Sequence, residues 1–194
     1  MTDLIVLAEP WWVNFLVIVP IILFWVLRKD PLEVAWRTLV MVGIFGIAFG
    51  YVEAAVVVYL RAASGFLPGY VGSLSDVIRL ASDSYQQIDA VRNIPQSLLA
   101  VEYFREIATI IMLSSVALIV AKRRSDRFAM FLWAFAFWDI FYYIGLWLTV
   151  RWPSTLMTND VLFLIPEPWL SQVWFPVLVS SLCIAAILTN LKRS

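Results

Sequence analysis

Long apolar stretches separated by short polar segments dominate the chain. Five of them are close to the roughly 20 residues that a helix needs to cross a bilayer, and they cover residues 11–27, 36–60, 98–121, 128–150 and 173–191. This pattern predicts an all-α fold, a single membrane domain over residues 1–194 built as an integral membrane helical bundle of five transmembrane helices.

Two segments between the predicted spans are longer than tight turns. Residues 61–94 carry apolar positions at helical spacing in LSDVIRLASDSYQQIDAVRN, which predicts an amphipathic outer helix on the membrane surface or over the bundle. Residues 151–172 hold three prolines around the short apolar run VLFLI. This run is too short to span, so we expect an interfacial or re-entrant outer loop.

The composition is typical of a multi-pass membrane protein, so we expect the lipid bilayer to be its main partner. Hydrophobic residues make up 62% of the chain and charged residues only 14%, whereas soluble domains carry about 25% charged residues. The net charge is zero, so nothing indicates binding to nucleic acid.

The basic residues predict the orientation. Nine of the fourteen fall on one side of the predicted spans: Arg28, Lys29, Arg37, Lys122, Arg123, Arg124, Arg127, Lys192 and Arg193. Because basic residues stay cytoplasmic, the N-terminus is expected outside and the C-terminus cytoplasmic. The opening residues MTDLIVLAEPWW lack the basic region of a secretory signal, so we expect an uncleaved start.

The second predicted span contains one acid, Glu53. It follows Gly43, Gly46 and Gly50 at spacings of three, four and three residues, so all four share one helix face. Small residues on such a face allow another helix to approach closely. We therefore expect Glu53 to face protein, either as a hydrogen-bonded link between helices or as part of a site.

The third and fourth predicted spans carry further charges. Glu102, Arg105 and Glu106 share one face of the third span, where Arg105 can pair with either acid and Glu102 is expected to be the shallowest. Asp139 lies twelve residues before Arg151, about 18 Å from the end of the fourth span. We expect Tyr142 and Tyr143, its neighbours along the helix, to donate hydrogen bonds to Asp139.

Together these residues predict a ligand- or ion-binding site in the outer half of the bundle, made of Glu53, Glu102, Arg105, Glu106, Asp139, Tyr142 and Tyr143. Four acids and one base cannot all be ionised in a low dielectric without compensation. Protons, a bound cation or water would supply it. Asp160 and Glu167 are expected either to form an outer lid or to be ordinary acids at a wet interface.

The absence of histidine and the single cysteine, Cys183, exclude several kinds of chemistry. The chain cannot form an internal disulfide, a histidine-ligated haem, a His/Cys zinc site or a Ser-His-Asp triad. No cofactor is evident from the sequence. If a metal binds, a hard divalent cation such as Ca²⁺, Mg²⁺ or Mn²⁺ held by Glu53, Glu106 and Asp139 is expected.

Four motifs, GYVEAAVVVYLR, REIATIIML, FWDIFYY and WPSTLMTNDVLFLIPEPW, resemble a group of uncharacterised bacterial polytopic membrane proteins of about five spans. The resemblance covers most of residues 43–180 and implies the bacterial cytoplasmic membrane. It brings no activity and no role for any residue.

Three functions remain open at this point. The carboxylates would bind a cation, protons or a polar small molecule, with transport as one use of that site and a homo-oligomer as its expected form. Alternatively, the chain is a membrane enzyme acting on a lipid or lipid-soluble substrate, or a structural subunit of a larger membrane complex. The excess of acids on three spans favours the first, because links between helices would not need such an excess.

Overall fold

The computed structural model describes residues 8–63 and 96–191, and these are mostly helical. The elements are the 3₁₀ helix η1 (Trp11–Val17), α1 (Ile18–Lys29), α2 (Trp36–Ala63), α5 (Gln96–Val120), α6 (Arg124–Val150), β1 (Asn159–Phe163), β2 (Trp169–Gln172) and α7 (Trp174–Thr189). The predicted all-α class fits this content.

Four helical stretches within the described residues are long and apolar enough to cross a membrane: Trp11–Lys29, Trp36–Tyr59, Leu99–Val120 and Arg124–Val150. The first of these begins as η1 and continues as α1. The fifth predicted span corresponds to α7, which has only 16 residues. The amphipathic helix predicted for residues 61–94 lies outside the described residues, apart from the last turn of α2.

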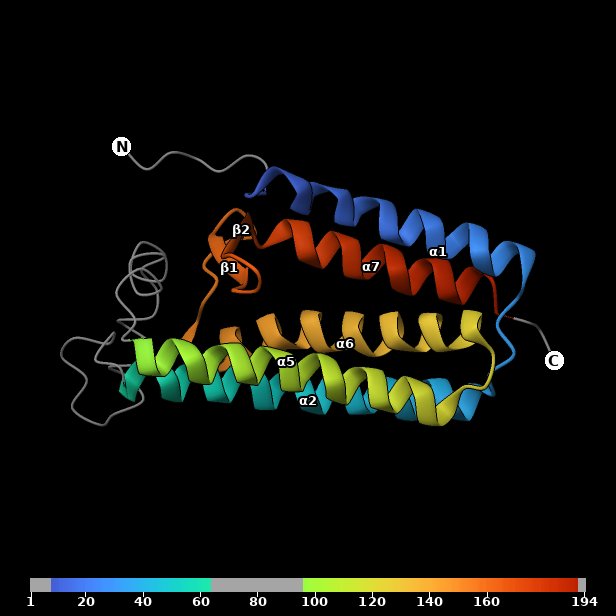
Figure 1. The fold of residues 1–194 in the computed structure, drawn as a ribbon, viewed down its shortest axis with the longest axis horizontal. Coiled ribbons are helices and arrows are strands. Elements are labelled where there is room, and N and C mark those ends of the chain that lie inside the picture. The colour runs from blue at the N-terminus through green and yellow to red at the C-terminus, as the bar shows by residue number, and fades with distance from the viewer. Residues whose placement is uncertain (1–7, 64–95, 192–194) are drawn as a thin grey trace.

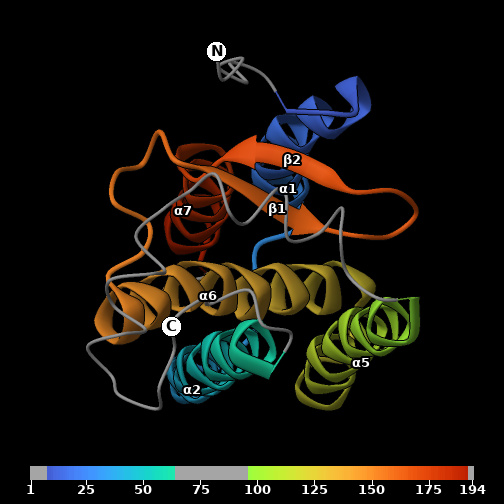
Figure 2. The ribbon, with the colours of Figure 1, turned by 90° about the vertical axis from the view of Figure 1, so that its left-hand side faces the viewer.

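Helix α6 is the centre of the bundle. It packs closely on α2, α7 and α5, and α1 packs on α7. In Figures 1 and 2, α1 and α7 lie on one side of α6, and α2 and α5 lie on the other. A large core of apolar side chains from α1, α2, α5, α6 and α7 fills the space between them.

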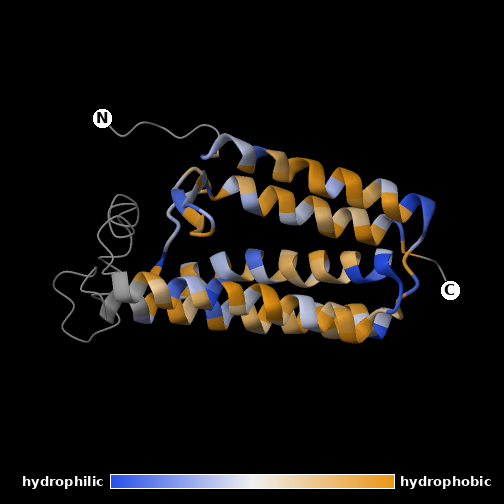
Figure 3. Cartoon of the chain, viewed as in Figure 1, coloured by the Kyte–Doolittle hydropathy of each residue, from blue (hydrophilic) through white to orange (hydrophobic). Residues whose placement is uncertain are grey.

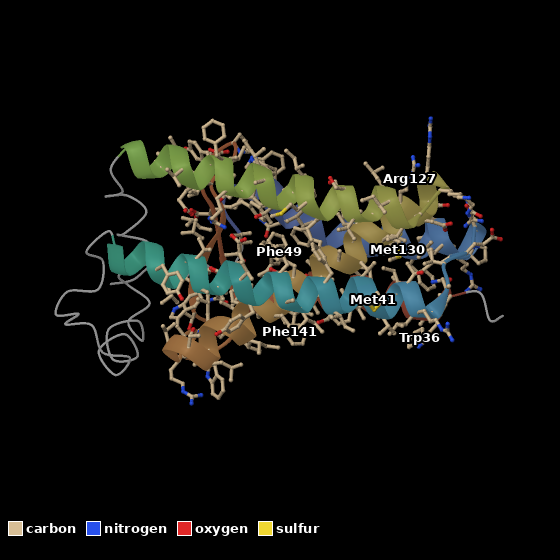
Figure 4. All side chains as sticks on the ribbon, turned by 90° about the horizontal axis from the view of Figure 1, so that it is seen from below. Trp36, Met41, Phe49, Arg127, Met130 and Phe141 are labelled. Atoms are coloured by element: carbon tan, nitrogen blue, oxygen red, sulfur yellow. The ribbon has the colours of Figure 1, made fainter. Side chains whose placement is uncertain are left out.

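Glycines set the distance between α2 and α6, in line with the prediction that another helix approaches this face closely. A Cβ atom on Gly46 would lie 2.7 Å from the carbonyl oxygen of Ala134, and one on Gly50 would lie 2.5 Å from that of Trp138. Both distances are shorter than real contacts allow, so only glycine permits this approach. In Figure 4, Phe141 of α6 lies along α2 next to this contact.

One end of the bundle, here called the basic end, contains the α1–α2 and α5–α6 connections (Figure 3). Arg123 connects them. Its guanidinium donates to Asp126 at 2.8 and 2.9 Å and to the carbonyl oxygen of Pro31 at 2.8 Å, and it pairs with Asp30 at 2.9 Å and with Glu33 at 3.3 Å. The hydrogen bonds to Asp126 raise the pKa of Arg123 above its ordinary value.

The opposite end, the hairpin end, is closed by β1 and β2. The segment predicted to be an interfacial or re-entrant loop contains a two-stranded antiparallel hairpin, with Asn159 opposite Gln172 and an irregularity between Val161 and Phe163. Its outer edge is extended by Glu9, which exchanges two backbone hydrogen bonds with Leu170, of 2.8 and 2.7 Å. The prediction missed the strands because the apolar run is short and its pairing partner follows two prolines.

Candidate functional site

A cavity of about 670 Å³ lies between α5, α6, α7 and the hairpin, and α2 and the η1–α1 segment complete its wall. Most of the predicted site residues line it, although they come from four different elements. They are Glu53 on α2, Glu102, Arg105 and Glu106 on α5, Asp139, Tyr142 and Tyr143 on α6, and Asp160 on β1. The volume is within the range of small-molecule sites.

Arg105 joins α5 to α2 through Glu53 and also pairs with Glu102 of its own helix. Its guanidinium pairs with the Glu53 carboxylate and donates to Glu102 Oε2 at 2.7 and 2.9 Å. Thr109, one turn along α5, donates to Glu53 Oε2 at 3.2 Å. Glu53 therefore faces protein, as expected, with 4% of its surface exposed. Glu102 is buried as well, although it is the acid nearest the start of α5.

Glu106 joins α5 to the hairpin. Both of its carboxylate oxygens accept the backbone N–H of Leu164, which follows β1, at 2.9 and 3.0 Å. Leu164 is itself buried. The charge-assisted bond satisfies a buried backbone donor at the point where the hairpin turns over the cavity.

Asp139 is held by a hydroxyl group from α7. Ser180 Oγ donates to Asp139 Oδ2 at 2.8 Å, and both residues are buried. The prediction that Tyr143 donates to Asp139 is wrong. Its phenol instead donates to Asp160 Oδ2 at 2.9 Å, because its side chain lies near β1. Within the described part of the chain, Ser180 is the only hydrogen-bond partner of Asp139.

The two predicted lid residues have different positions. Asp160 is buried in the cavity wall, where it accepts the Tyr143 hydroxyl. Glu167 lies away from the cavity and accepts the indole N–H of Trp12 at 3.3 Å in an exposed contact. The hairpin therefore contributes Asp160 to the site, and Glu167 anchors the hairpin to η1.

Aromatic rings form much of the remaining wall. Trp138 lies 5.2 Å from Phe135 and 6.2 Å from Tyr142 between ring centroids, and Phe163 lies 5.4 Å from Trp169. The indole N–H of Trp138 is buried and has no hydrogen-bond partner among the described residues. No sequence pattern singles out Trp138 or Ser180, because tryptophan and serine are common in apolar helices and only the packing brings these two residues to the cavity.

The described residues offer no preformed metal centre: no three Asp, Glu or Cys side chains are grouped closely enough to hold an ion. Glu53, Glu106 and Asp139 line one cavity, but each carboxylate has a different partner on a different element. Binding of a divalent cation by these three residues stays a prediction.

Comparisons with known proteins identify no relative of this chain. No family model matches the chain, and no curated protein and no solved structure matches it. Any role for the cavity must therefore be argued from its own residues.

Proposed function

We propose that this chain is an integral membrane protein with five spans whose cavity binds a small organic molecule carrying a positive charge, such as an amine. Four described helices have the length and apolarity to span a bilayer. Their outward faces carry large exposed apolar side chains, as lipid-facing helices do, including Met41, Tyr59, Phe104 and Ile119. The resemblance to bacterial membrane proteins favours the bacterial cytoplasmic membrane.

In this proposal the basic end is cytoplasmic and the hairpin end faces outward. The orientation is tested in a Cys183→Ser background by labelling intact cells with a membrane-impermeant maleimide. Met157→Cys lies at the hairpin end, where Met157 is exposed, and should be labelled. Ser125→Cys at the basic end should react only after the cells are opened. The reverse result would contradict the orientation.

The observation that carries the binding proposal is the charge of the cavity wall. Among the described lining residues there are five carboxyl groups and one guanidinium: Glu53, Glu102, Glu106, Asp139, Asp160 and Arg105. Arg105 lies between Glu53 and Glu102 and compensates those two acids first. A positively charged ligand would compensate Glu106 and Asp139, since buried ionised carboxylates need a counter-charge.

Asp139 is the acid best placed to contact such a ligand. Its only described partner, Ser180, is neutral, so the hydroxyl orients the carboxylate without balancing its charge. The neighbouring aromatic wall of Phe135, Trp138 and Tyr142 is suited to an organic cation, which is attracted to ring faces. A cavity of 670 Å³ also has far more room than a bare ion needs. These features favour an organic cation over a metal ion or protons.

Thermal unfolding in phosphatidylcholine nanodiscs tests the proposal with n-butylamine as the probe and n-butanol as its neutral analogue. We expect butylamine to raise the melting temperature and butanol to have no effect. The shift should disappear in Asp139→Asn, which keeps the size of the side chain and removes its charge. Calcium, magnesium and manganese chlorides are added separately to test the metal alternative.

Two outcomes would refute this function. Equal shifts with butylamine and butanol would show that charge has no part in binding. A shift with a divalent metal and none with butylamine would favour a cation site instead. Glu33→Gln at the basic end, remote from the cavity, is the control for a general effect of removing an acid.

A further inference from the structure

The wall of the cavity changes character along α6. Asp139, Tyr142 and Tyr143 lie toward the hairpin end, whereas the lining residues closer to the basic end are apolar: Phe128, Phe131, Leu132, Phe135 and Ala136. From Phe128 to Asp139 the helix rises about 16 Å. The cavity therefore has a charged half and an elongated apolar half.

One side of helix α5 is bonded to α2, and another side is exposed. Arg105 and Thr109 lie on the edge that bonds to Glu53 of α2. Ile107 and Ile111 lie on the other edge, where they line the cavity while 44% and 58% of their surfaces are exposed. Residues four apart share a helix face, so the two isoleucines form a continuous apolar border.

The η1–α1 segment contributes further apolar side chains to the cavity wall. Leu16 and Val19 line the cavity from there, and Phe128, 40% exposed, lines it from the start of α6. In the view along the bundle, α5 lies beside α2 and α6 and away from α1 (Figure 2). The hairpin covers the end of the cavity, where Leu164 is bonded to Glu106. The cavity is thus partly open, and the side opening has an apolar border.

From this arrangement we infer that the ligand is a single-chain amphiphile with an amine head group, which enters from the hydrocarbon layer between α5 and the η1–α1 segment. The head group lies against Asp139, and the alkyl chain lies in the apolar half toward Phe128. Ile107 and Ile111 lie near the middle of α5, so in a bilayer this apolar border would face lipid chains and lipid-soluble molecules would reach it directly. The inference rests on the proposed function.

Spin labelling tests the side opening. Ile111→Cys in a Cys183→Ser background is labelled with a nitroxide in phosphatidylcholine nanodiscs, and its accessibility to oxygen and to a water-soluble nickel chelate is measured. We expect high accessibility to oxygen and low accessibility to nickel, as for a label at exposed Ile119. Higher accessibility to nickel would show an aqueous opening, and low accessibility to both would show a covered one; either result would overturn the inference.

A chain-length comparison tests the position of the alkyl tail. Dodecylamine and butylamine are titrated against the wild type and against Ile110→Trp, which fills the apolar half because Ile110 lines it. We expect dodecylamine binding to weaken about tenfold, equivalent to the loss of roughly two buried methylenes, while butylamine binding is unchanged. Ile119→Trp, outside the cavity, is the matched control, and Leu132→Phe, at another lining position of the apolar half, serves if Ile110→Trp does not fold.

The outcomes separate the two proposals. If dodecylamine and butylamine bind alike and neither filling variant weakens dodecylamine, the amphiphile inference fails and amine binding stands. If neither amine binds the wild type, the proposed function fails and the inference fails with it.

Discussion

Glu106 on α5 holds the backbone N–H of Leu164 with both carboxylate oxygens, at 2.9 and 3.0 Å. This one contact joins a bundle helix to the residue that follows β1. Because both residues are buried, the closure of the hairpin end over the cavity depends on the carboxylate of one acid on α5.

Replacement of Glu106 by alanine should therefore destabilise the protein. A buried N–H left without an acceptor costs about 1–3 kcal/mol. Glu106→Gln keeps a carbonyl oxygen and should lose less than Glu106→Ala. The free energy of unfolding in mixed micelles measures both. Equal losses in the two variants would show that the Leu164 bond contributes little.

Gly50→Ala should separate α2 from α6. The new Cβ would lie 2.5 Å from the Trp138 carbonyl oxygen and 2.9 Å from the Tyr142 nitrogen, and backbone atoms cannot move aside. We expect a loss of about 1–3 kcal/mol, the usual cost of overpacking. Gly43→Ala is the matched control, since its Cβ would be 3.5 Å from its nearest neighbour and alanine favours the helix. Thermal unfolding should rank Gly43→Ala at or above the wild type.

Tyr143 and Asp160 should be energetically coupled. The hydroxyl-to-carboxylate bond of 2.9 Å is buried, and contacting polar pairs show coupling energies of about 0.5–3 kcal/mol. A double-mutant cycle with Tyr143→Phe and Asp160→Asn measures it. A parallel cycle on Ser125 and Asp30, whose 2.6 Å bond is exposed, should give a smaller value. Similar values in both cycles would contradict the role of burial.

Arg123→Lys should lower the melting temperature, because an ammonium group cannot donate to Asp126, Pro31 and Asp30 together as the planar guanidinium does. Arg124→Lys, at an exposed position next to it, is the control and should change little. Asp126 raises the pKa of Arg123 above the ordinary arginine value. The contacts of Arg123 therefore stabilise the fold fully at any pH below that ordinary value, and this stabilisation is lost only as the pH rises through the raised pKa. A melting temperature equal to that of Arg124→Lys would show that the contacts are not needed.

The local part of the architecture was readable from the sequence. Apolar runs located the helices, and the glycine spacing before Glu53 identified a face that another helix can approach closely. The start of α6 at Arg124 was missed by four residues, because its first turn is polar and hydropathy detects only apolar runs. The hairpin was missed because a short apolar run fits a strand or part of a helix equally well.

The pairing of the acids could not be predicted, because it depends on contacts between distant segments. Ser180 lies 41 residues from Asp139, and Leu164 lies 58 residues from Glu106. The spacing within each helix showed which charges share a face, and it predicted that Arg105 would pair with neighbouring acids. It could not show that Tyr143 would donate its hydrogen bond to Asp160, or that Ser180 would donate one to Asp139.

The close contact between α2 and α6 also determines when the helices can pack together during synthesis. Helix α5 lies between the two partners in the chain, so the ribosome completes α5 before any of α6 exists. Until then, the glycine face of α2 has no α6 backbone to meet. The assembly of the bundle is therefore delayed until the second half of the chain has emerged, and a truncation before residue 124 would leave α2 and α5 without the helix that both pack against.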